Sequence, residues 1–104
     1  MLMSTTTARS TVACSTTVAT LLAAVSSAPQ SLGLTPGTRV GVMIHNSTSA
    51  TLYVRFGSGA SSTDYDVALV AGATYESQAV VWMGIITGIL STGTGDVRVV
   101  EFRL

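Results

Sequence analysis

Charged residues are scarce in this chain of 104 residues. It contains five arginines, no lysine and five acidic residues, so 10% of its residues are charged and its formal net charge is zero. Soluble domains usually carry about 25% charged residues. A nucleic-acid backbone is held by a basic field, which this composition does not supply. We therefore expect no nucleic-acid partner, and a surface that packs against other protein.

Cysteine and long apolar runs are also scarce. Cys14 is the single cysteine, so no intrachain disulfide can form, and it lacks the neighbours that a metal site needs. We interpret it as a small apolar residue of an N-terminal strand. No apolar run reaches about 18 residues, so we expect no membrane span. Residues 1–17 carry one arginine in a Ser/Thr tract, which argues against a secretory signal.

No constellation of catalytic or ligand residues stands out. His45 is the only histidine, and it ends a predicted strand, where a hydrogen-bonded edge histidine is the ordinary role. Asp64 and Asp66 are a weak cation-site candidate, although hard cations take six or more oxygens, so a solvated loop pair is the simpler interpretation. The glycine-rich segments 57–59 and 93–95 lack the lysine and helix of phosphate loops. We predict no enzyme, no catalytic residue, no metal and no cofactor.

The few aromatic side chains offer one candidate site. Tyr53, Arg55, Tyr75 and Trp82 are the residue types that protein interfaces favour, so we consider them a candidate interaction face. The alternative is that these aromatic side chains pack in the core or on a sheet. One tryptophan and three tyrosines are few for a carbohydrate-binding groove.

Residues 40–56 organise the predicted fold. Apolar side chains occupy every second position in residues 40–45 and again in residues 51–56, which is typical of half-buried strands. The polar segment 46–50 between them has the length and composition of a turn. This stretch therefore predicts a β-hairpin.

Further strands are expected on both sides of that hairpin. They are predicted at residues 17–23, 65–69, 74–77, 84–90 and 97–103. Residues 65–77 would form a second hairpin, and Gly84 and Gly88 would bend the strand that follows Trp82. Residues 26–38 contain both prolines and are expected to form a long loop. About seven short strands predict an all-β fold, a small antiparallel β-sandwich or barrel with a jelly-roll-like form.

The domain boundaries follow from polarity. Residues 1–16 are predicted to be a flexible N-terminal arm, because their Ser/Thr composition buries little, and residues 17–104 to be a single β-sandwich domain. Residues 39–104 number roughly 66, and a core of that size seldom supplies more than about 3–5 kcal/mol. We therefore expect the N-terminal segment, a neighbouring subunit or both to complete the core, which favours a homo-oligomer.

Five segments share a pattern with a known family. They are residues 44–57 (IHNSTSATLYVRFG), 62–69 (STDYDVAL), 71–76 (AGATYE), 84–89 (GIITGI) and 95–101 (GDVRVVE). Together they resemble small β-domains in the virion proteins of tailed bacteriophages, over about residues 40–102. His45 and Arg55 stand at positions that vary in the family, and residues 80–83 are more apolar than its pattern.

The resemblance implies a structural protein of the phage particle. For a chain of this size it implies a capsid decoration (cement) protein that binds the major capsid protein on the outer capsid surface of the virion. The chain would also bind itself as a homo-oligomer, with a trimer as one option, and the arm would attach by strand addition. One alternative is a fibre, spike or tail-associated module that binds host-surface glycans. Another is a secreted carbohydrate-binding domain.

Overall fold

The computed structural model describes residues 6–25, 38–77 and 81–104. Within them the chain forms eight strands: β1 (Thr6–Cys14), β2 (Ala19–Leu22), β3 (Arg39–Asn46), β4 (Leu52–Phe56), β5 (Val67–Leu69), β6 (Thr74–Glu76), β7 (Ile86–Leu90) and β8 (Gly95–Arg103). These ranges contain no helix that could cross a membrane. Apart from Thr38, the predicted loop at residues 26–38 lies outside the described residues.

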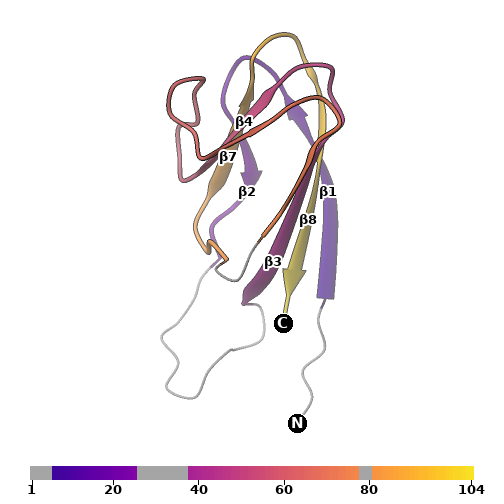
Figure 1. Ribbon diagram of the computed structural model, residues 1–104. Helices are drawn as coiled ribbons and strands as arrows, with labels where there is room; N and C mark the ends of the chain where they lie inside the picture. The colour runs from indigo at the N-terminus through magenta and orange to yellow at the C-terminus, as the bar shows by residue number, and fades with distance from the viewer. Residues whose placement is uncertain (1–5, 26–37, 78–80) are drawn as a thin grey trace.

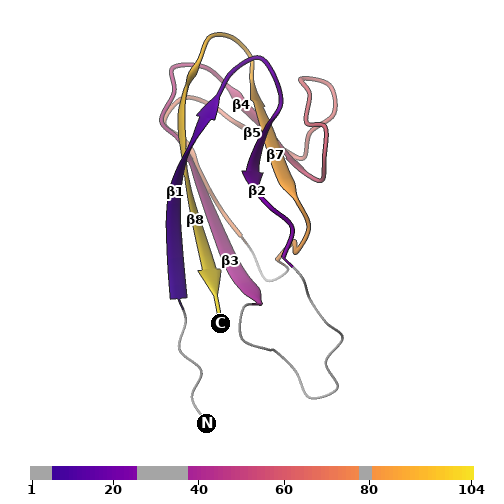
Figure 2. The same ribbon diagram turned by 180° about the vertical axis from the view of Figure 1, so that it is seen from behind.

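The strands form two antiparallel sheets that face each other (Figures 1 and 2). The first sheet has the order β1-β8-β3-β6, and the second sheet has the order β2-β7-β4-β5. Apart from β4 and β5, strands that follow one another in the chain lie in opposite sheets. This alternation is the connectivity of a jelly roll. The predicted all-β sandwich of jelly-roll-like form is confirmed, with eight strands where about seven were expected.

Both predicted hairpins are wrong, although their strands are present. β3 belongs to the first sheet and β4 to the second, and β5 and β6 are divided in the same way. Period-2 alternation shows only that a strand has one buried face. It does not indicate which sheet the strand joins. The turns at residues 47–51 and 70–73 therefore carry the chain across the sandwich.

The interpretation of residues 1–16 as an arm outside the domain is wrong for residues 6–14. These residues form β1, which pairs with β8 over its whole length, from Thr6 opposite Arg103 to Cys14 opposite Gly95. Side chains 6–11 are exposed, so no apolar pattern marks this strand in the sequence. Its backbone hydrogen bonds, which any residue type can form, hold it on the sheet.

The core lies between the two sheets. Its buried apolar members are Cys14, Leu21, Val42, Ile44, Ala50, Leu52, Val54, Leu69, Ile86, Leu90, Val97 and Val99. Gly88 faces this core, where an added Cβ would lie 2.9 Å from Leu21 Cδ1 and 3.2 Å from Leu52 Cδ1. The glycine therefore allows the strands to pack closely at this point. In β8, Val97, Val99 and Glu101 form the buried face of the strand.

Candidate interaction surface

The four residues of the predicted interaction face do not lie together. Tyr53 and Arg55 alternate with the buried Leu52 and Val54, so they lie on the outer face of the second sheet. Tyr75 lies opposite the buried Ile44 in the β3–β6 pairing. Its ring therefore points between the sheets, where it contacts Phe56 at a centroid distance of 5.5 Å.

Trp82 precedes β7, outside the strands that carry the other three residues. Its indole Nε1 donates a hydrogen bond to the Ile85 carbonyl at 2.9 Å. An added Cβ on Gly84 would lie 2.7 Å from Trp82 Cζ2, so the ring covers this glycine. Trp82 is nevertheless 47% exposed.

Tyr53 and Arg55 instead meet the loop between β4 and β5. The Tyr53 and Tyr65 rings lie 4.8 Å apart between centroids, and an Arg55 guanidinium nitrogen donates to Asp64 Oδ2 at 2.6 Å. Asp66 accepts a hydrogen bond from the Phe56 amide at 2.8 Å. The two aspartates therefore have different partners. No group of three or more potential metal ligands occurs in the described part of the chain.

The first sheet contains a buried ion pair that was not predicted from the sequence. Arg39 is fully buried, and its Nε donates to Glu101 Oε2 at 2.7 Å. Glu101 also accepts a hydrogen bond from Arg103 Nε at 2.7 Å. The pair therefore lies between β3 and β8 at the inner face of the first sheet.

The other nitrogens of Arg39 bind the second half of the sandwich. They donate to the carbonyls of Ala23 at 2.7 Å, Trp82 at 2.6 Å and Gly84 at 3.0 Å. These carbonyls follow β2 and precede β7, so one side chain ties both sheets together. One signal was present in the sequence: Glu101 shares the inward face of its strand with Val97 and Val99, and a buried acid requires a cationic partner.

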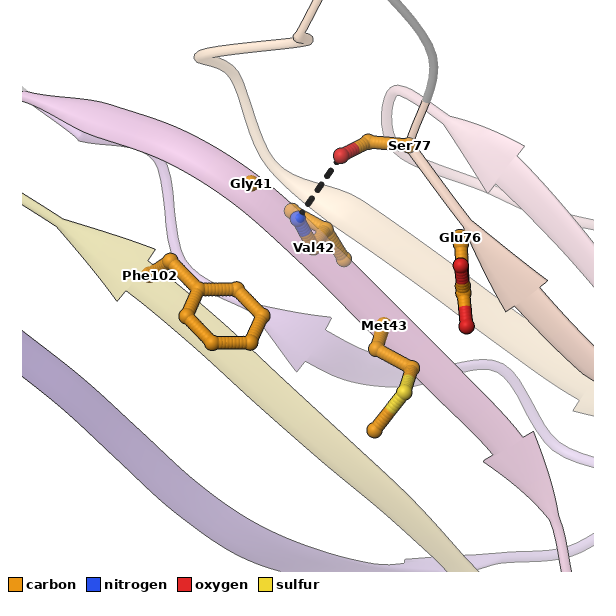
Figure 3. Close-up of a pocket in the computed structure, with 6 residues that line it drawn as sticks. All are labelled: Gly41, Val42, Met43, Glu76, Ser77 and Phe102. Atoms are coloured by element: carbon orange, nitrogen blue, oxygen red, sulfur yellow. Dashed lines mark hydrogen bonds between the residues drawn. The ribbon is translucent and has the colours of Figure 1, made fainter.

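The outer face of the first sheet carries a shallow apolar groove (Figure 3). It has a volume of about 260 Å³ and is lined by Gly41, Val42, Met43, Glu76, Ser77 and Phe102. Phe102 lies opposite Gly41 in the β3–β8 pairing. An added Cβ on Gly41 would lie 3.1 Å from Phe102 Cδ2, so the ring occupies the space that the glycine leaves.

Val100 extends this groove along the sheet, beside Met43. Met43 is paired with Val100, and Gly41 with Phe102; we call these four residues the apolar strip. Polar and charged side chains flank the strip, namely Arg9, His45, Glu76 and Arg98. His45 is hydrogen-bonded at the end of its strand, as predicted, with Nδ1 2.7 Å from Thr74 Oγ1. An apolar centre with a polar rim is the usual anatomy of a protein interface.

Cys14 is a buried residue at the end of β1, as predicted. Burial, together with the negative charge of Asp96, raises the pKa of its thiol from 9.0 to about 11. The nucleophilic form of cysteine is the thiolate. Cys14 therefore remains a protonated core residue at neutral pH.

No family model matches the chain, and neither the curated proteins nor the solved structures provide a match to it. The sequence resemblance and the surfaces described above are therefore the basis on which a function is inferred.

Proposed function

We propose that this protein is a bacteriophage capsid decoration protein that binds the outer surface of the major capsid lattice and stabilises it. The observation that carries the proposal is the jelly-roll connectivity, β1-β8-β3-β6 facing β2-β7-β4-β5. Viral capsid proteins use this architecture, and lectins use it too. A fold alone supports many functions, so the proposal from the fold is an analogy. The surface of the molecule must also be suited to binding a protein shell.

The outer face of the first sheet supports attachment to a protein shell. The apolar strip provides area that gains free energy when water leaves it. Its rim carries both signs of charge, with Glu76 beside Met43 and Arg98 beside His45 in the strand pairings. A chain with zero formal net charge also has little long-range repulsion between copies at neighbouring lattice positions.

One observation favours the second candidate, a fibre or tail-associated module that binds host-surface glycans. Tyr65 is 42% exposed and contacts Tyr53, with the Arg55–Asp64 ion pair next to them in the same strand and loop. Aromatic rings provide apolar faces with a polar edge, and charged groups beside them can hydrogen-bond to hydroxyls. This surface lies on the second sheet, so the two candidates use opposite faces of the molecule.

A binding experiment with two substitutions separates the candidates. Met43→Lys places a charge in the apolar strip, opposite Glu76 in the β3–β6 pairing. Opposite charges on paired strands are compatible with the sheet, so the fold is expected to be retained. Shell binding is expected to fall at least tenfold. Thr92→Lys adds the same charge in an exposed turn and is the matched control. Both proteins are incubated with phage heads that lack the decoration protein, and bound protein is measured after sedimentation.

The outcomes are distinct. Normal head binding by Met43→Lys, with its fold verified by circular dichroism, would remove the first sheet from the proposed interface. Binding of the native chain to host glycans that is lost in Tyr65→Ala, without any binding to heads, would favour the fibre or tail module.

A further inference from the structure

β1 is the longest edge strand of this sandwich in the part of the chain that the structure describes. It is the outermost strand of the first sheet (Figure 2) and contains nine residues, whereas the other outermost strands, β2, β5 and β6, contain four, three and three. Proteins usually protect a long edge with charged side chains, above all lysine, or with proline or a bulge. β1 has the sequence TTARSTVAC and an uninterrupted register with β8. It therefore has no lysine, proline or bulge, and Arg9 is its single charged residue.

The hydrogen-bond pattern identifies the backbone groups at this edge. The Val42 amide and carbonyl both bond to Ser77, on the β6 side of β3. The backbone amide and carbonyl of Val42 therefore point away from β8. The residue of β8 that pairs with Val42 is Glu101, and its backbone amide and carbonyl point toward β1, where Glu101 lies opposite Ala8. Because antiparallel pairs alternate along a strand, the even-numbered residues of β1 bond to β8.

The odd-numbered residues of β1 consequently point their backbone amides and carbonyls toward the open edge. These are Thr7, Arg9, Thr11 and Ala13, and in the described part of the chain no strand lies beyond them. Each presents an amide and a carbonyl that an added strand would satisfy.

We propose that β1 pairs with β1 of a second copy of this chain, antiparallel, around a two-fold axis at Ser10. When residues 6–14 of one copy pair along their full length with residues 6–14 of the other copy, Ser10 lies opposite Ser10. Thr7 then pairs with Ala13, and Arg9 with Thr11. All the open-edge groups are satisfied by about eight inter-strand hydrogen bonds.

The side chains of β1 suit this register. Arg9 lies opposite Thr11, so the two arginines are not directly opposed, which would be destabilising. On the other face Ala8 lies opposite Val12, an apolar pair. A two-fold contact requires a surface that complements itself, and β1 meets this requirement over its whole length.

The pairing also bears on attachment to a shell. An axis perpendicular to the sheet keeps the same face of both copies on one side, so the two apolar strips would lie on one continuous surface. Two linked sites bind a lattice more tightly than either site alone. This last step rests on the proposed function, whereas the pairing itself rests on β1.

Disulfide trapping tests the register. Ser10→Cys is made together with Cys14→Ala, which removes the native thiol. The Cα atoms of such a non-hydrogen-bonded pair lie about 4.5 Å apart, within the range of a disulfide. We expect a reducible covalent dimer under mild oxidation. Thr11→Cys in the same background is the control, since position 11 is equally exposed but lies opposite Arg9. Cross-linking at position 10 that is no greater than at position 11 would overturn the proposal.

A proline substitution tests the pairing without new thiols. The Thr11 amide faces the open edge, so Thr11→Pro blocks an added strand but retains the hydrogen bonds to β8. Sedimentation velocity should show dimers for the native chain at high concentration and only monomers for Thr11→Pro, with similar circular dichroism spectra. A native chain that is monomeric at every concentration would refute the pairing. If that monomer still bound phage heads, the proposed function would survive without it.

Discussion

At the scale of single residues, Arg39 and its partner Glu101 connect the first sheet to the segments that flank β2 and β7. A buried charge is tolerated only with a partner, and removal of one partner from such a pair typically costs about 3–5 kcal/mol. Arg39 is fully buried and bonds to Glu101 and to three carbonyls. Its contribution is therefore expected to depend on the carboxylate.

Glu101→Gln should lower the free energy of unfolding by about 3 kcal/mol or more, because Arg39 would keep its charge without a counter-charge. Urea denaturation measures the change. Arg103→Gln is the control, since the Arg103 side chain is 42% exposed and its ion pair with the same carboxylate should contribute less than about 1 kcal/mol. Similar losses for the two variants would contradict the assigned role of Arg39.

Cys14 supplies a prediction about pH. Its pKa is raised to about 11 in the folded protein, from 9.0, so between these values the unfolded chain loses the thiol proton before the folded chain does. Stability should therefore fall as the pH rises from 9 to 11, with a slope of at most about 1.4 kcal/mol per pH unit. Denaturation of the native chain and of Cys14→Ala over this range gives the difference. Parallel curves would show that the thiol contributes nothing.

At the scale of elements, the turn after β3 depends on one buried amide. Asn46 Nδ2 donates to the Ala50 and Leu69 carbonyls at 2.8 Å each, and Oδ1 accepts from the amide and hydroxyl of Thr48. These bonds hold the segment that crosses from the first sheet to the second. Every polar atom of this side chain is engaged.

Asn46→Asp should destabilise the protein by more than about 2 kcal/mol. The carboxylate cannot donate to the two carbonyls, and it places a buried charge against them. Thermal unfolding measures the change, with Ser47→Asp as a control at an exposed neighbouring position. An Asn46→Asp protein as stable as the control would show that the amide is not what holds the turn.

Strand positions in the described ranges were predictable, whereas strand partners were not. Alternation located β3, β4 and β8 because each has one buried face. It could not tell a hairpin from a crossing, because the turn at residues 47–51 is polar in either case. β1 escaped prediction for a different reason: its exposed Ser/Thr side chains carry no pattern, and its pairing with β8 depends on the backbone.

At the scale of the whole molecule, the N-terminal segment helps to complete a small core, as the energetics suggested. β1 contributes Cys14, and Leu21 of β2 packs in the same cluster. The candidate site was predicted less well than the fold. Tyr53, Arg55, Tyr75 and Trp82 were grouped by residue type, but a surface depends on which sheet and which face each strand presents. The homo-oligomer stays a prediction, and the apolar strip emerged only from the β3–β8 register.

Cryo-electron microscopy of virions that carry this protein tests the central claim most directly. We predict density of jelly-roll shape at regular positions over the outside of the head, with the apolar strip of the first sheet against the shell. Density only at the tail tip or fibres, or heads without it, would contradict the assignment as a capsid decoration protein.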